Sequence, residues 1–163
     1  MFRKTARETA GESLVFDFYL APRGRVPGLH VHPKLEERWQ VLAGCAGARI
    51  GRRRHRAEAG AQLVVPAGTP HVLWNEGSEE LHVLNEFRPA LNMEGFLEAF
   101  LGLAASGKVG RRGIPPMSQM VALLDSYPNE IALPLVPHGF QRAGLTALAA
   151  ASRVFARRRR PAM

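Results

Sequence analysis

The sequence predicts an all-β barrel or sandwich followed by an α-helical extension. Two observations support this fold class. Short apolar segments recur along the first half of the chain, separated by Gly, Pro and Asn-Glu-Gly, and the spacing of apolar residues becomes helical after Pro89. Many short strands at such an interval are typical of sandwiches and barrels. We therefore divide the chain into a β-barrel at 1–89 and a helical extension at 90–163 with a basic tail.

The strand prediction rests on alternation. In the segment 13–20, SLVFDFYL, apolar residues alternate with Asp17 and Tyr19, which is the period-2 pattern of a half-buried strand. Seven further short segments follow at similar spacing, and they cover 28–32, 37–43, 46–51, 53–57, 62–66, 71–75 and 80–88.

Three helices are predicted in the extension. The first is NMEGFLEAFLGLAASG, which ends at Gly107, and the second covers 116–126. After a Pro-rich stretch, the segment 139–160 shows an apolar stripe at helical spacing, and its basic end complements the helix dipole. The extension has too little apolar patterning of its own to be a separate domain.

The composition excludes several classes of protein. With 163 residues and 46% apolar residues, the chain can form one domain with its own core. Cys45 is the only cysteine, so no internal disulfide forms. No segment approaches the roughly 20 apolar residues of a membrane span, and the first residues lack a signal-peptide pattern. We therefore expect a cytoplasmic protein.

The formal charge of +8 is concentrated in two places. Without ten clustered arginines, the charge would be −2. No aromatic residues lie between these arginines, so the sequence does not predict nucleic-acid binding. The two groups are Arg49, Arg52, Arg53, Arg54 and Arg56 in one hairpin, and Arg153, Arg157, Arg158, Arg159 and Arg160 in the tail.

Four residues have the spacing of a metal site. His30 and His32 are two residues apart, so on a strand both imidazoles lie on one face. Glu37 begins the next strand-like segment, where its carboxylate can lie opposite the histidines. His71 follows the turn VVPAGTP.

Three imidazoles and one carboxylate form a mixed nitrogen and oxygen set without sulfur. Such a set suits a divalent Fe, Mn, Zn, Ni, Co or Cu ion, and the sequence does not choose among them. Four protein ligands on an ion that accepts six leave two positions for substrate, water or O2.

These residues resemble the two motifs of the cupin superfamily. The first motif, G-x5-H-x-H-x(3,4)-E-x6-G, and the second, G-x5-P-x-G-x2-H-x3-N, are both complete, and the resemblance covers about residues 13–89. The matching positions are Gly24, His30, His32, Glu37 and Gly44, then Gly60, Pro66, Gly68, His71 and Asn75.

The resemblance implies an all-β jelly-roll barrel (a double-stranded β-helix) with a C-terminal α-helical extension. It also bears on two adjacent glutamates, because the family spacing from His32 allows either Glu36 or Glu37 as the ligand. Only Glu37 keeps six residues before Gly44, and neighbouring strand residues face opposite sides. We therefore expect Glu37 to face inward and Glu36 to face solvent.

Three further residues are candidates for substrate binding. Trp39 and Leu73 share the inward faces of Glu37 and His71, where they form either an apolar wall for an organic ligand or ordinary barrel core. Asn85 lies on the last predicted strand, on the face opposite to His82, Leu84 and Glu86. We expect Asn75 to cap a turn and not to bind metal.

The functional hypothesis is a small metalloenzyme that acts on a small organic substrate. The reaction would be of the oxygenase or of the isomerase or lyase type, and no catalytic residue beyond the metal ligands is assigned. The alternative is a non-catalytic metal-binding or small-molecule-binding module that dimerises or assists a partner enzyme. Sheet edges and the apolar extension predict a homodimer.

Overall fold

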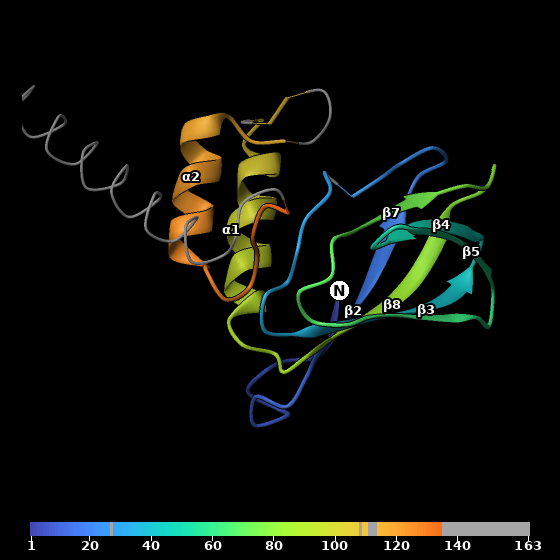
Figure 1. Ribbon diagram of the computed structural model, residues 1–163, viewed down its shortest axis with the longest axis horizontal. Coiled ribbons are helices and arrows are strands. Elements are labelled where there is room, and N and C mark those ends of the chain that lie inside the picture. Colours follow the sequence, from blue (N-terminus) through green and yellow to red (C-terminus); the bar gives the residue numbers. More distant parts are fainter. Residues whose placement is uncertain (27, 108, 111–113, 135–163) are drawn as a thin grey trace, which may run out of the picture.

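The computed structural model describes residues 1–26, 28–107, 109–110 and 114–134, which form two β-sheets with two helices beside them (Figure 1). The third predicted helix and the tail arginines lie outside these residues. The elements are β1 (Phe2–Lys4), β2 (Leu14–Leu20), β3 (Glu36–Ala43), β4 (Cys45–Ile50), β5 (Arg53–Glu58), β6 (Gln62–Val65), β7 (His71–Asn75), β8 (Leu81–Arg88), α1 (Met93–Ala105) and α2 (Met117–Ser126).

The strands form a sandwich of two antiparallel sheets. The larger sheet has the order β1-β2-β8-β3-β6, and the smaller has the order β5-β4-β7. Their ladders are separate, so the sheets pack on each other without closing into a continuous barrel. This double-sheet architecture is the predicted jelly roll.

Two local differences from the predicted strands have physical reasons. The segment predicted as strand 28–32 forms only single bridges, from His30 to His71 and from Val31 to Ala132, because its two sides pair with different parts of the chain. The short strand β1 was not predicted, since FRK carries no alternation, and its pairing with β2 is irregular.

The core between the sheets follows the predicted alternation. On β8, Leu81, Val83, Asn85 and Phe87 are buried, while the residues between them are partly exposed. The smaller sheet contributes mainly short side chains. The buried core cluster contains Trp39, Val41, Ala46, Ala48, Ala57, Val65, Leu73, Leu81 and Val83.

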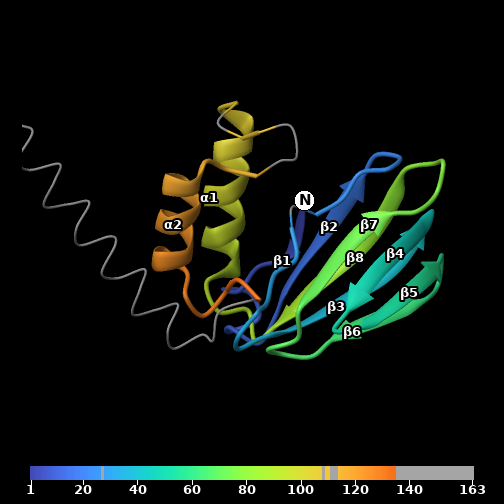
Figure 2. The ribbon, with the colours of Figure 1, turned by 45° about the horizontal axis from the view of Figure 1, so that its top comes forward.

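The first helix shares a second core cluster with the end of the larger sheet. Met93 and Phe96 of α1 pack in a buried cluster with Leu14, Leu35 and Phe87. Both helices lie on the β1 side of the larger sheet, away from β5, with α2 on the far side of α1 (Figure 2). The domain boundary at residue 89 stays a prediction. Among the described residues, no helix has the length and apolar character needed to cross a bilayer.

Candidate metal centre

Backbone pairing brings the four predicted ligand residues together from three parts of the chain. His30 and His71 exchange two backbone hydrogen bonds, with N···O distances of 3.2 and 2.9 Å, so the segment before β3 lies against the start of β7. His32 follows two residues later and projects to the same side. Glu37 reaches this side from the second position of β3.

The side chains of these residues converge on one point. One ligand atom from each of His30, His32, Glu37 and His71 lies within 4.8 Å of all the others. The Oε2 atom of Glu37 is 3.0 Å from Nε2 of His71 and 3.5 Å from Nε2 of His32. His32, Glu37 and His71 are buried, and only His30 is partly exposed.

Each of the three imidazoles donates a hydrogen bond from Nδ1, the nitrogen that faces away from the centre, to a backbone carbonyl. Nδ1 of His71 donates to the carbonyl of Thr69 at 2.7 Å, and Nδ1 of His30 donates to the carbonyl of Gly28 at 3.2 Å. Nδ1 of His32 donates to the carbonyl of Glu130. Because a carbonyl oxygen only accepts, each Nδ1 carries the proton, and a neutral ring then presents a lone pair at Nε2.

The converging atoms are therefore acceptors without donors. Nε2 of His32, Nε2 of His71 and Oε2 of Glu37 are all buried and have no hydrogen-bond partner. A buried polar atom without a partner is costly, and acceptors 3.0 Å apart repel each other. A cation at their centre removes both penalties, so the arrangement fits a metal ion.

The electrostatics of the centre point in the same direction. Burial, followed by the neighbouring charges of His32 and His71, lowers the pKa of His30 to about 3, so this ring is neutral at physiological pH. Burial alone would raise the pKa of Glu37, but His32 and His71, when protonated at Nε2, donate to this carboxylate and attract it, which outweighs burial and holds the pKa well below its usual value. A neutral imidazole and an ionised carboxylate are the forms that bind metal.

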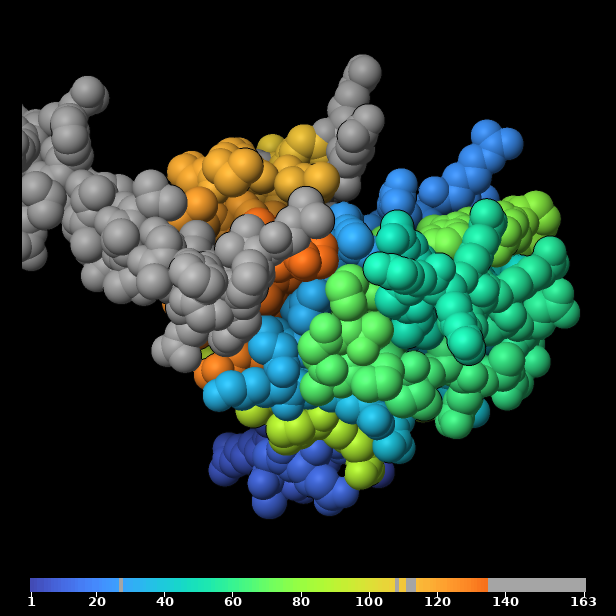
Figure 3. Space-filling model, in the orientation of Figure 1, coloured from blue at the N-terminus to red at the C-terminus, as the bar shows by residue number. Residues whose placement is uncertain are grey.

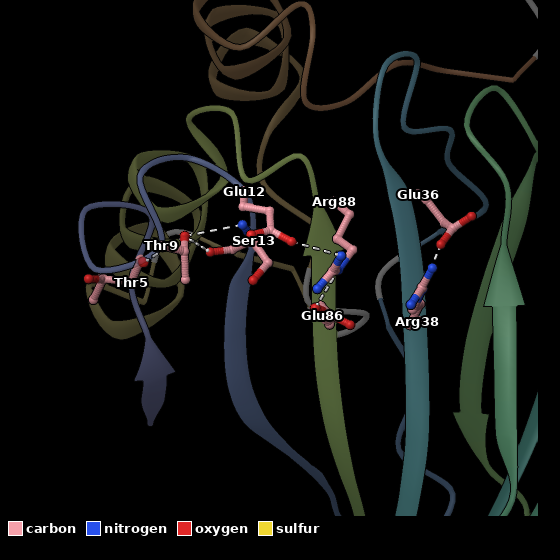
Figure 4. A network of polar contacts seen from close by, with 8 residues as sticks. All are labelled: Thr5, Thr9, Glu12, Ser13, Glu36, Arg38, Glu86 and Arg88. Carbon is pink, nitrogen blue, oxygen red and sulfur yellow. Dashed lines mark hydrogen bonds and ion pairs between the residues drawn. The ribbon is translucent and has the colours of Figure 1, made fainter.

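The structure separates the two adjacent glutamates as predicted. Glu37 is 6% exposed and belongs to the converging group. Glu36 points away from it and forms an ion pair with Arg38 at 2.6 Å on the outer face of the sheet, where Glu86 and Arg88 make a similar pair at 2.7 Å (Figure 4). The alternation along β3 explains this difference.

The three predicted substrate residues all lie inside the sandwich. Trp39 and Leu73 belong to the buried core cluster, and the Trp39 ring is 5.8 Å from the ring of His71. Asn85 is opposite Trp39 in the β3–β8 ladder, is 4% exposed, and has no hydrogen-bond partner for Oδ1. Trp39 and Leu73 thus belong to the core, with Trp39 beside His71, whereas Asn85 offers a free acceptor.

The other residues considered in the sequence lie away from the centre. Asn75 accepts a hydrogen bond from the backbone of Gly77 and donates to the carbonyls of Leu20 and Glu79, so it caps the predicted turn. His82 lies on the outer face of β8 and contacts Asp17.

One residue of the centre's surroundings was not predicted from the sequence. Glu130, in the extension, supplies the carbonyl that accepts from His32, a residue 98 positions earlier in the chain. A backbone carbonyl leaves no trace in residue type, so sequence reasoning had no signal for this contact.

Comparison with known proteins agrees with this architecture. Residues 10–86 match the family model described as Cupin domain. This region is a domain of the cupin superfamily. In this cupin, all four converging residues lie within the matched region.

Part of this chain is similar to solved structures. A protein from Thermotoga maritima, described as a predicted oxalate decarboxylase, has a TM-score of 0.51 and 22% identity, over 53% of this chain and 75% of that one. A Klebsiella pneumoniae protein with a double-stranded β-helix domain has a TM-score of 0.47 and 24% identity, over 50% and 70% of the two chains. At these identities, the likeness concerns the fold alone. Comparison with curated protein sequences finds no match.

Proposed function

We propose that this cupin binds one divalent metal ion through His30, His32, Glu37 and His71 and acts as a small metalloenzyme on a small organic substrate. The observation that carries the proposal is the set of buried acceptor atoms that face one another without a donor. When bound, such an ion supplies Lewis-acid chemistry or, if it is redox-active, oxygen chemistry. The candidates remain Fe, Mn, Zn, Ni, Co and Cu.

The residues around the centre would orient the substrate and exclude water. His30 is the only partly exposed member of the group, so the substrate would approach from its side. Phe87 packs its ring 5.2 Å from the ring of His32, and Trp39 packs against His71, which keeps the inner side apolar. The free Oδ1 of Asn85 would accept a hydrogen bond from a hydroxyl or amine group of the substrate.

A second candidate function is a non-catalytic binding module. Its support is the burial of three of the four ligand residues, which are at most 6% exposed. A closed coordination shell is more typical of a structural metal than of a catalytic one. A homodimer in the cytoplasm is expected for either function, and light scattering would measure the oligomeric state.

The metal content of the purified protein tests the site. Wild-type protein expressed without added metal should contain close to one transition-metal ion per chain by mass spectrometry, and His71→Ala should contain far less. His82→Ala is the matched control, because this histidine also contacts a carboxylate but lies on the outer face. Unchanged metal content in a folded His71→Ala protein, verified by circular dichroism, would contradict the site.

Oxygen uptake separates the two functions once the metal is known. Bound iron or manganese, together with O2 consumption on addition of candidate organic acids, would support an oxygenase. Substrate turnover without O2 consumption would support an isomerase or lyase. Tightly bound zinc without any turnover would support the binding module.

A further inference from the structure

The extension reaches back to the metal centre through the residues that follow α2. Val31, which lies between two of the ligand histidines, exchanges two backbone hydrogen bonds with Ala132, at 3.0 and 2.8 Å. In the space-filling view, the orange end of the described chain packs against the light-blue residues near 30 (Figure 3). We call residues 127–132 the return segment.

The return segment makes a direct contact with a ligand. The carbonyl of Glu130 accepts the proton on Nδ1 of His32, and both groups are buried. This hydrogen bond directs Nε2 of His32 towards Glu37 and His71. For His30 and His71, the equivalent carbonyl comes from two residues earlier in the chain, so only His32 depends on a distant segment.

The carboxylate of Glu130 holds its own carbonyl in place. Oε1 accepts from the backbone N–H of Asn92, just before α1, at 3.1 Å, and Oε2 accepts from the backbone N–H of Asn129 at 3.2 Å. The hydroxyl of Tyr127 donates to the carbonyl of Gly95 at 3.0 Å. The return segment is thus attached to the first helix as well as to the β-domain.

We propose that Glu130 is a positioning residue for His32 and that the helical extension is a working part of the metal centre. The part of this inference that concerns metal affinity rests on the proposed function. Without the carbonyl at this position, the His32 ring can carry its proton on either nitrogen and can rotate, so fewer molecules present the Nε2 lone pair. Loss of a hydrogen-bond partner that orients a metal ligand from behind typically lowers metal affinity by about 10- to 100-fold.

The experiment compares four full-length variants with the wild type. Glu130→Ala removes both carboxylate contacts. Glu130→Gln keeps one acceptor oxygen and should partly restore the wild-type behaviour. Tyr127→Phe loosens the attachment to α1 without touching Glu130, and Glu98→Ala changes an exposed glutamate of α1.

Two readouts are needed. Zinc affinity is measured by competition with a chelating dye, and ¹⁵N shifts of the His32 imidazole are measured in the metal-free protein. We expect Glu130→Ala to weaken zinc binding by about 10-fold or more and to shift His32 from a single Nδ1–H form towards a mixture. Glu130→Gln should fall between this variant and the wild type. Tyr127→Phe should have a smaller effect than Glu130→Ala, because both carboxylate contacts of Glu130 remain, and Glu98→Ala should match the wild type in both readouts.

The outcomes distinguish this inference from the proposed function. If the wild type does not bind zinc or another first-row ion, the metal site fails, while the ¹⁵N shifts still test the positioning of His32. If the wild type binds zinc and Glu130→Ala binds it equally, with unchanged His32 shifts, the positioning role is wrong. It is also wrong if Tyr127→Phe weakens zinc binding as much as Glu130→Ala at equal thermal stability.

Discussion

Carboxylate and imidazole groups form two clusters, one inside the sandwich and one on its outer face. The two clusters have similar residue types, but only the outer one supplies hydrogen-bond donors to its carboxylate. On the outer face, Asp17 accepts from Nε and Nη2 of Arg3, at 2.7 and 2.8 Å, and from Nε2 of His82 at 2.7 Å. Inside, Glu37 faces two imidazole nitrogens whose rings have already used their protons on backbone carbonyls.

The comparison shows that residue type alone does not make a metal site. The outer cluster is a matched set, in which donors satisfy the carboxylate. The inner cluster has an excess of buried acceptors, and this excess is what a cation satisfies. Substitutions that change donors and acceptors without changing size therefore test the comparison directly.

The largest expected effect is that of Glu37→Gln. Zinc affinity should fall by more than about 100-fold. Losing a hydrogen-bond partner behind a ligand typically lowers metal affinity by up to that factor, and this substitution removes a ligand itself. The metal-free protein at pH 8 should become more stable, since the new amide N–H can donate to Nε2 of His71. Zinc titration and thermal unfolding measure the two effects.

The matched control for this variant is Glu36→Gln, whose side chain lies on the outer face and should change neither quantity beyond the loss of its pair with Arg38. Wild-type zinc affinity in Glu37→Gln would show that the inner cluster does not bind metal. A strong loss of stability in the metal-free Glu37→Gln protein would show that its acceptors are not in excess.

A smaller effect is expected from metal removal. A ligand present at 100 times its dissociation constant stabilises the folded state by about 2.7 kcal/mol. For a chain of this size, that corresponds to a shift in melting temperature of about 5–10 °C. Adding a chelator to the metal-loaded wild type should therefore lower the melting temperature by this amount in calorimetry.

His71→Ala provides the control for this measurement, because it should melt at the same temperature with and without the chelator. An equal chelator-induced shift in this variant would place the stabilising metal elsewhere in the protein.

The smallest effect concerns the outer cluster and pH. Hydrogen bonds from Arg3 and then from His82 lower the pKa of Asp17 below its usual range. The pKa of Asp17 in the folded state is thus below its value of about 3.9 in the unfolded state. The stabilisation of the fold by Asp17 is therefore complete above about pH 3.9 and is lost as the pH falls below it. The difference in melting temperature between the wild type and Asp17→Asn should be the same at pH 7 and pH 5, and it should be smaller at pH 3.

Zinc affinity should be the same in the wild type and Asp17→Asn, which contrasts with Glu37→Gln. A difference in melting temperature that stays constant from pH 7 to pH 3 would contradict the role assigned to Asp17.

Much of the β-domain could be predicted because its information is local. Alternation along 13–20 correctly predicted the residues of β2 that lie in or against the two core clusters, and the same rule placed Glu37 inside and Glu36 outside. The helices at Met93–Ala105 and Met117–Ser126 were predicted within a few residues. The segment 28–32 was less predictable, because its pairing depends on partners far away in the chain.

The sequence by itself determined which residues could form the metal centre, because the spacing of His30, His32, Glu37 and His71 and the strand alternation that turns them to one face are properties of the chain. Only the tertiary structure decided the rest. The Nδ1 atoms are held by backbone carbonyls, and the carbonyl of Glu130 comes from the helical extension. Main-chain groups are the same for every residue type, so their placement follows from packing and cannot be read from the sequence.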